Sequence, residues 1–527
     1  MNPEMTAFLR AIAEEPADDT SRLVFADWLE EHDQPARAEF IRLQIALSRM
    51  DPAEEGYAEK TARMRRCGIF TQPGTQPFFD HVPSPNYKIG FQRGLIGTLS
   101  GQNLESLDPS GFSLLPLECL RAHRINIELF KSFTKLRWLQ LSCGRETGPD
   151  RLLEIFGPTG WFPQLETLSL GELNRDCLEA GVIPQFNLPR LRNFVLSTDS
   201  FYNLGVFVEN TTDEEDDYGS SRTWTGLSDY LPRNAIPSKL CPLERFVWHT
   251  DDDSDYYRDG RFWAGPTMES LLEHLKIHKL KQVEVAVDWD DHEGGGEGVD
   301  AAIYERNPLE LCPTLEHVTV ERQGMGLLTS KKKRLRSLRV YEAYDVDHSL
   351  IRLLAQPVCS ELESLHVQIR AGGADQPLSE QTRTFAKLRS LTGLGFTLLS
   401  NCSFPNLLNL SASLTGVMER KWPKLQTLTT SFSKLSELKT FMKSDCCPHL
   451  TTLTIGPYYQ DYYESAKIDF SFLADCPHMP YLSLIHLAGY PRDQTFIVNG
   501  GKLFPVRDDV MVEEIKPFTM YRISEVF

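Results

Sequence analysis

The spacing of apolar residues repeats along most of the chain. From Cys312 to Val320, an apolar residue and a proline are followed by Leu315, Val318 and Val320, a Leu-x-x-Leu-x-Leu spacing. Because a β-strand turns successive side chains to opposite faces, Val318 and Val320 share one face, and the preceding turn sends Leu315 to the same side. Equivalent units begin at Leu136, Leu165, Leu191, Leu243, Leu280, Leu315, Leu335, Leu362, Leu388, Leu407, Leu425, Leu450 and Met479. Each unit predicts one short strand that stacks its apolar side on the next.

The distance between units indicates the fold class. Leu136 to Leu165 is 29 residues and Leu165 to Leu191 is 26, within the range of leucine-rich repeats. We therefore predict an α/β fold, a leucine-rich repeat solenoid with a curved parallel sheet on its concave side and mixed helices and loops on its convex side. The steps of 19 and 18 residues from Leu388 to Leu407 to Leu425 leave no room for a full convex helix.

Other patterns flank the repeats. Residues 1–67 carry helical apolar spacing, with Phe8, Leu9 and Ile12 in the first of four short predicted helices. Residues 68–90 are rich in proline and glycine and are expected to form a linker. The solenoid is assigned to 91–490. In 491–527, the Asn499-Gly500-Gly501 stretch between apolar runs predicts a β hairpin that caps the last repeat.

The amino-terminal helices also resemble a known module. Arg22-Leu23-Val24-Phe25-Ala26-Asp27-Trp28-Leu29-Glu30-Glu31, followed by Arg37-Ala38-Glu39-Phe40-Ile41-Arg42-Leu43-Gln44, is similar to the bacterial repeat-companion domain, found ahead of leucine-rich repeats. Phe91-Gln92-Arg93-Gly94 resembles the segment that opens the repeats in such proteins. Asp33-Gln34-Pro35 stands where that family has a glycine-containing turn. The resemblance implies an architecture and no activity.

The positions between the buried leucines are the candidate binding residues. They alternate with the core positions and are expected on the concave sheet surface, where solenoids bind partners. Aromatic and arginine residues among them are typical of interface hot spots. The predicted partner-binding residues are Trp138, Gln140, Arg245, His317, Arg339, Tyr341, His366 and Gln368. No metal is predicted at His317 or His366, because neither has a cysteine or carboxylate partner at a recognisable ligand spacing.

Acidic insertions near 209–217, 250–259 and 288–298 interrupt the repeats. The second and third follow consecutive strands and are expected to stack as one acidic rim. Its residues are Asp251, Asp252, Asp253, Asp255, Asp288, Asp290, Asp291 and Glu293. Three interpretations remain open: solvated insertions, a docking site for a basic partner, and a calcium site, although the EF-hand spacing is absent.

Composition narrows the functional classes. The net charge of −18 repels phosphate backbones, so nucleic acid is not expected as a partner. No apolar run reaches the length of a membrane helix, and the acidic amino terminus does not resemble a signal peptide. Several of the 11 cysteines occupy an apolar slot before proline, which indicates buried thiols and a cytoplasmic protein.

These patterns favour binding over catalysis. Motifs such as His-Glu-x-x-His, Gly-x-x-x-x-Gly-Lys, Gly-x-Ser-x-Gly and Cys-x-x-Cys are absent, and no cofactor is expected. The predicted function is a non-catalytic scaffold or sensor that binds a protein partner through the concave face. A calcium-responsive regulator acting through the acidic rim is the alternative, and a hydrolytic enzyme is a third hypothesis.

Overall fold

The structure is a computed structural model of the chain. It describes residues 3–70, 87–101, 104, 114–122, 130–131, 133, 135–143, 147–173, 175–198, 234–237, 241–252, 272, 275, 278–289, 298–301, 307–321, 326–328, 335–342, 349–369, 383–393, 402–432, 434–456, 469–488, 494–506 and 510–512.

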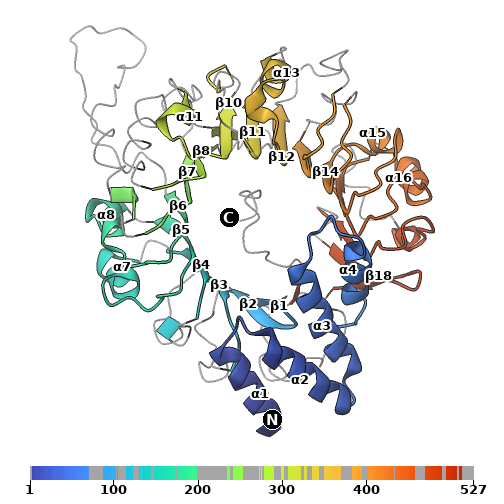
Figure 1. The fold of residues 1–527 in the computed structure, drawn as a ribbon, viewed down its shortest axis with the longest axis horizontal. Coiled ribbons are helices and arrows are strands. Elements are labelled where there is room, and N and C mark those ends of the chain that lie inside the picture. Colours follow the sequence, from blue (N-terminus) through green and yellow to red (C-terminus); the bar gives the residue numbers. More distant parts are fainter. Residues whose placement is uncertain are drawn as a thin grey trace.

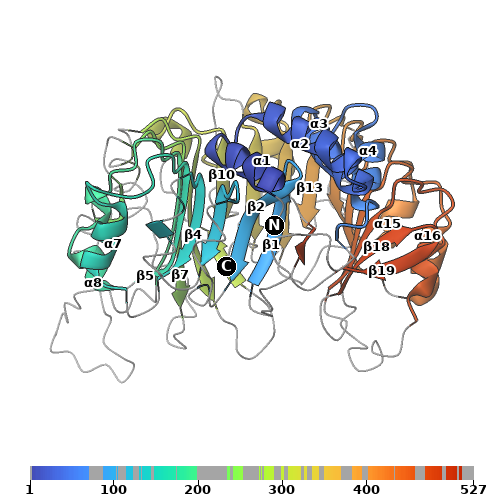
Figure 2. The ribbon, with the colours of Figure 1, turned by 90° about the horizontal axis from the view of Figure 1, so that it is seen from below.

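The described strands form one curved sheet that bends around a central space. Figure 1 shows the strands on the inner side of a ring, helices on the outer side, and the amino-terminal helices between the first and the last strands. Figure 2 shows these amino-terminal helices along the edge where the parallel strands begin. The protein is thus a mixed α/β structure with a long, mainly parallel sheet.

Residues 3–70, here called the helical module, contain α1 (Pro3–Glu14), α2 (Asp19–Glu31), α3 (Pro35–Arg49) and α4 (Tyr57–Arg65). Asp18 caps α2 by accepting a hydrogen bond from the Thr20 backbone. Asp33, in the turn before α3, has φ +62°, a left-handed conformation that aspartate tolerates better than most residues. The turn thus has the geometry that favours glycine without having a glycine.

Parallel strands follow in chain order. They are β2 (Leu95–Gly101), β3 (Cys119–Ala122), β4 (Trp138–Ser142), β5 (Thr167–Leu173), β6 (Asn193–Thr198), β7 (Arg245–Asp252), β8 (Gln282–Trp289), β10 (His317–Glu321), β11 (Ser337–Glu342), β12 (Ser364–Ile369), β13 (Ser390–Gly393), β14 (Asn409–Ser411), β15 (Thr427–Thr430), β16 (Thr452–Ile455) and β17 (Leu484–Leu487). Each pairs in parallel with the next, and β9 (Gly298–Ala301) pairs antiparallel with β8.

Antiparallel strands cover both ends of this array. At the start, β1 (Tyr87–Gln92) pairs with β2 through a two-residue turn at Arg93 and Gly94, whose φ angles of +48° and +85° match a type I′ hairpin. β1 therefore begins within the stretch expected as a linker; residues 71–86 of that stretch lie outside the described residues.

At the other end, β18 (Gln494–Asn499) pairs with β17, and β19 (Lys502–Pro505) pairs with β18 across the turn at Gly500 and Gly501. The short β20 (Val510–Met511) then returns to the beginning of the array and pairs with β1. The outer edges of β2 and β17, the first and last parallel strands, are thus paired within the chain, and the sheet ends instead in the short strands β19 and β20.

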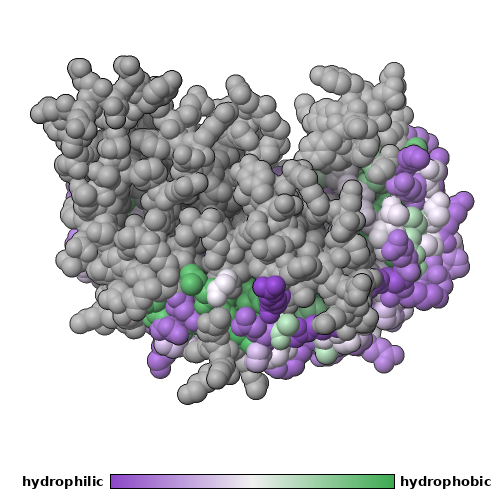
Figure 3. All heavy atoms as spheres, turned by 90° about the horizontal axis from the view of Figure 1, so that it is seen from above, coloured by the Kyte–Doolittle hydropathy of each residue, from purple (hydrophilic) through white to green (hydrophobic). Residues whose placement is uncertain are grey.

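Short helices and turns close the units on the outer side. They are α7 (Pro149–Phe156), α8 (Arg175–Glu179), η2 (Ile183–Gln185), α11 (Pro308–Leu311), α13 (Ser349–Leu354), η4 (Pro357–Cys359), α15 (Leu414–Met418), α16 (Leu435–Met442) and η6 (Ser471–Ala474). Only the five-residue α15 fits between β14 and β15, where the repeat step is 18 residues. Figure 3 shows mainly hydrophilic residues, with small hydrophobic areas, on the C-terminal side at its right.

The slot before proline is buried, as its apolar occupants predicted, except at Cys476, which is half-buried. Cys241, Cys312 and Cys447 are at most 3% exposed, and Phe162 and Trp422 occupy the same slot with similar burial. All 11 cysteines are free thiols. Burial raises the pKa of several of them, for example that of Cys119 to about 12, so these thiols stay protonated at neutral pH.

Candidate functional site

Two rows of side chains run along the inner side of the sheet. The first row consists of the residue that opens each strand: Cys119, Trp138, Thr167, Asn193, Arg245, Gln282, His317, Ser337, Ser364, Ser390, Asn409, Thr427 and Thr452. The second row lies two residues further along each strand: Arg121, Gln140, Ser169, Val195, Val247, Glu284, Thr319, Arg339, His366, Thr392, Ser411, Thr429 and Thr454. Strand pairing thus aligns residues that are far apart in sequence.

Six of the predicted binding residues lie in these two rows. In β11 and β12 the predicted positions lie two residues too far along the strand. Trp138, Arg245 and His317 belong to the first row, and Gln140, Arg339 and His366 belong to the second. In β11 and β12 the first row is occupied by Ser337 and Ser364, which were not among the predicted binding residues. Tyr341 and Gln368 are paired in register at a third position, and their side chains lie outside the described residues.

Burial divides the rows into two parts. From β4 to β10 most inner positions are covered, and Trp138, Arg245 and His317 are only 7%, 1% and 3% exposed; Gln140 and Asn193 are half-buried. Arg121 lies over the Trp138 ring at 5.2 Å, a cation–π contact that occupies the aromatic face. These three predicted hot spots are therefore not open surface in this conformation.

A cluster of charged side chains joins the covered part of the sheet to Arg339 of β11, which is partly accessible. The Arg339 guanidinium lies 3.2 Å from Glu284 Oε1, and Gln282 Nε2 donates to Glu284 Oε2 at 3.3 Å. Burial lowers the pKa of Arg245 to about 10, although the charge of Glu284 raises it in part. A carboxylate between two guanidinium groups compensates for much of the cost of burying them.

His317 lies in the same positive environment. Burial lowers its pKa to about 4, and the charges of Arg336, Arg245 and Lys281 add to the effect. The ring is therefore neutral at physiological pH.

From β11 to β16 the two rows are more open. Apart from Ser364, their residues are partly or fully accessible: Ser337, Arg339, His366, Ser390, Thr392, Asn409, Ser411, Thr427, Thr429, Thr452 and Thr454. Most are small and uncharged, and His366 Nδ1 lies 2.7 Å from Thr392 Oγ1. We call these accessible positions the open face.

A third row of side chains, which was not predicted from the sequence, lies where the strands begin. It is the residue directly after the first leucine of each unit, and its charges alternate in sign: Glu118, Arg137, Glu166, Arg192, Glu244, Lys281, Glu316, Arg336, Glu363 and Arg389. We call this row the charged rim. The signal was present in the sequence as a charge that alternates from one repeat to the next.

Ion pairs link neighbours along the charged rim. The Glu244 carboxylate lies 2.8 Å from the Lys281 ammonium and 3.5 Å from the Arg192 guanidinium. Arg336 lies 2.6 Å from Glu363 and 3.8 Å from Glu316. Each pair is partly exposed and contributes about 0.2–1 kcal/mol, but the alternation also keeps like charges from adjoining strands.

The helical module is linked to both ends of the charged rim, at the first end through Arg93 and at the last end directly. Arg93, in the first hairpin, lies 3.1 Å from Glu118 and 3.6 Å from Asp19 of α2. At the far end, Arg389 Nη1 lies 3.0 Å from both carboxylate oxygens of Asp51, in the segment between α3 and α4. The module thus supplies an acidic residue to the arginine at each end.

Inside the module, the ion pairs tie helices together. Arg42 lies 2.6 Å from Asp27 and 2.7 Å from Glu30, and Arg63 pairs with Glu39. These contacts join α3 to α2 and to α4, so Asp27, Glu39 and Arg42 hold the helices of the module together.

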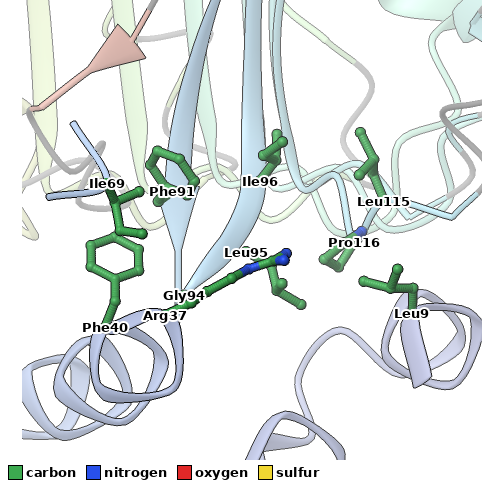
Figure 4. A pocket seen from close by; sticks show the side chains of 10 residues that line it. All are labelled: Leu9, Arg37, Phe40, Ile69, Phe91, Gly94, Leu95, Ile96, Leu115 and Pro116. Carbon is green, nitrogen blue, oxygen red and sulfur yellow. The ribbon is translucent and has the colours of Figure 1, made fainter. Parts of the chain in front are cut away.

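A small cavity lies between the module and the first hairpin. It measures about 20 Å³ and is lined by Leu9, Arg37, Phe40, Ile69, Phe91, Gly94, Leu95, Ile96, Leu115 and Pro116. Figure 4 shows the Arg37 side chain extended into it. Burial lowers the pKa of Arg37 to about 10. The volume suffices for one water molecule and excludes a larger ligand.

The structure describes only the strand ends of the acidic rim. Asp251 in β7 is the register partner of Asp288 in β8, and Asp252 is paired with Trp289. The side chains of these aspartates, and Asp253, Asp255, Asp290, Asp291 and Glu293 entirely, lie outside the described residues. Within the described ranges, no group of three or more His, Cys, Asp or Glu residues is placed to hold a metal ion. The calcium alternative stays a prediction.

Comparisons with known proteins add little. No protein-family model matches the chain, and no curated protein matches it. Among solved structures, the chain is similar to one titled "Crystal structure of Rad7 and Elc1 complex in yeast", with 13% identity, 82% of this chain and 90% of that chain covered, and a TM-score of 0.29. This TM-score is too low to carry an argument about function. In the part of the chain that the structure describes, no helix is long and apolar enough to cross a membrane.

Proposed function

We propose that the protein is a non-catalytic interaction scaffold or sensor, a leucine-rich repeat solenoid that binds a protein partner on the inner side of its sheet. The open face is the observation that carries this proposal. It combines two aligned rows of accessible polar side chains with a rigid support, because the alternate residues Leu391, Leu410, Leu428 and Leu453 are buried in a continuous core. Concave sheets of stacked repeats are well suited to binding.

The proposed site differs from the one expected from the sequence. Arg339 and His366 remain in it, whereas Trp138, Arg245 and His317 are buried in the covered part of the sheet. Small hydroxyl side chains such as Thr427 and Thr429 hold few rotamers, so little conformational entropy is lost when a partner covers them. The strands from β11 to β16 are proposed as the site because their inner positions are accessible. The alternation of residues in the sequence does not reveal which inner positions are accessible.

The helical module is proposed to be a structural companion of the repeats. The resemblance of its helices to the repeat-companion domain stays a prediction, because it rests on Arg22 to Gln44 and on the Phe91–Gly94 segment alone. Its contacts with both ends of the charged rim support a role in holding the array, and they suggest no reaction.

A matched pair of substitutions tests the proposal. Thr429→Arg places a long cation on the open face, whereas Thr440→Arg places the same side chain on α16, where Thr440 is exposed on the outer side. Tagged full-length protein is used to capture partners from native lysate, which are identified by mass spectrometry. We expect a partner that wild type and Thr440→Arg retain and that Thr429→Arg loses. Equal capture by both variants, with unchanged circular dichroism, would exclude the open face as the binding site.

A further inference from the structure

The helical module touches the first and the last strands of the array by different kinds of contact. Towards the first hairpin an aromatic cluster is added to the polar contacts of Arg93 with Asp19 and the Ala17 carbonyl. Phe40 of α3, Phe70 at the end of the module and Phe91 of β1 pack edge to face, with ring centroids 5.3–5.9 Å apart. All three rings are at least 93% buried. Separating them would expose apolar surface to water.

The backbone at the first hairpin is also fitted to the module. Gly94 has φ +85°, and a Cβ atom added to it would overlap Ile41 of α3. The Gln44 side chain, 2% exposed, accepts a hydrogen bond from the Gly94 amide. This junction therefore depends on close packing as well as on apolar burial.

Towards the last strands, the described hydrogen bonds involve charged and polar groups. Arg65 Nη1 donates to Thr451 O and Thr452 Oγ1, both at 3.0 Å. Arg66 donates to the carbonyls of Val498, Pro480 and Leu482 at 3.0–3.1 Å. Water can replace guanidinium and carbonyl partners when they separate, which limits the net contribution of such contacts.

The row of the charged rim changes character where the module contacts the last strands. After Arg389, the equivalent residues of the next units are Leu408, Gln426, Thr451 and Ser483, which carry no charge. Ser483 is the equivalent because strand pairing places the start of the last unit at Leu482, so the predicted start at Met479 was wrong by three residues. The Pro52 carbonyl accepts from Gln426, and Arg65 also lies 3.4 Å from Ser483 Oγ. The module thus covers the stretch where the charged rim ends, and Asp51 continues its alternation beyond Arg389.

We propose that the helical module is a reversible clasp that stays attached to β1 and β2 and releases β13 to β17, so that among the described strands the two-residue pairing of β20 with β1 is what still joins the ends of the array. The aromatic junction keeps the module on the first hairpin, because its release would expose buried rings. The guanidinium contacts and the Asp51–Arg389 pair, whose side chains are 41% and 44% exposed, give way first. This inference stands whether or not the open face binds a partner.

The test measures the distance across the releasable contact in the full chain. Spin labels are introduced as noncanonical residues at Glu55, before α4, and at Lys424, before β15, both exposed. Double electron–electron resonance then reports the distance distribution. Wild type at low salt should show one short distance, and 1 M salt should add a longer one, because salt weakens exposed charge contacts.

Matched variants separate the clasp from the rest of the module. The double variant Arg65→Ala, Arg66→Ala should raise the long-distance population at least about tenfold, which corresponds to about 1.4 kcal/mol. Arg63→Ala is the control: Arg63 is on the same helix but pairs with Glu39 inside the module, so the distribution should stay as in wild type.

Two results would overturn the proposal. An unchanged short distance in the double variant and in wild type at 1 M salt would make the module a fixed part of the ring. Loss of the folded array in the double variant, seen by circular dichroism, would show that the contact is required for folding and does not open independently.

Discussion

Replacing Gly94 by alanine should destabilise the junction between the helical module and the sheet. The residue has φ +85°, where an alanine costs about 1–2 kcal/mol. The new methyl group would also lie 2.7 Å from Ile41 Cβ and closer still to its Cα, so α3 must shift at a typical cost of about 1–3 kcal/mol. The sum is about 2–5 kcal/mol, a large part of the stability of an ordinary domain.

Two other glycines provide references. Gly500 has φ +56° but no atom within 4 Å of an added Cβ, so Gly500→Ala isolates the backbone cost of about 1–2 kcal/mol. Gly326 has neither feature, and Gly326→Ala should change stability by less than about 0.5 kcal/mol. Urea unfolding followed by circular dichroism should rank the three variants Gly94, Gly500, Gly326 by loss of stability. Equal midpoints for Gly94→Ala and Gly326→Ala would refute the reasoning.

Three further predictions concern the core, the inner rows and the charged rim. Leu365→Asp puts a charge at a fully buried position and should cost more than about 4 kcal/mol, with faster hydrogen exchange in β11 and β13 as well as in β12. The His317 side chain binds a proton below about pH 6.5 in the unfolded chain but only near pH 4 in the folded protein, so the stability falls as the pH drops through this window. Between pH 7 and pH 4.5, the wild type should lose about 2–3 kcal/mol more of its free energy of unfolding than His317→Asn, as measured by urea unfolding. Glu244→Gln removes the carboxylate shared by Arg192 and Lys281 and should cost about 1 kcal/mol at low salt and nearly nothing at 1 M salt, as urea midpoints would reveal.

The sequence was sufficient to predict most of the parallel strands, but not β1 or β9. Apolar alternation after Leu136 or Leu335 marks where a strand begins because only one register puts Leu139 or Leu338 into the core. The same alternation identifies the side chains of the inner face. In β11 and β12, however, Ser337 and Ser364 occupy the first row. The inner positions of a strand must therefore be counted from the first leucine of its unit.

Contacts between distant segments were not predictable in this way. Whether Arg245 or Thr427 is accessible depends on what covers the inner side, which no local pattern contains. The charged rim is visible as residue types, but Arg192 and Glu244 become neighbours only through the pairing of β6 with β7. The docking of Arg65 on Thr451 spans 386 residues, far beyond any repeat period.

The contact between Arg66 and Val498 has a consequence for biosynthesis. The two residues are 432 positions apart, so at about 5–20 residues per second the module leaves the ribosome roughly 20–90 s before its last partner exists. During that time each new strand can stack on its predecessor, because those contacts span only one unit. Translation order therefore makes ring closure the final step of folding, and until then Arg65 and Arg66 are solvated by water alone.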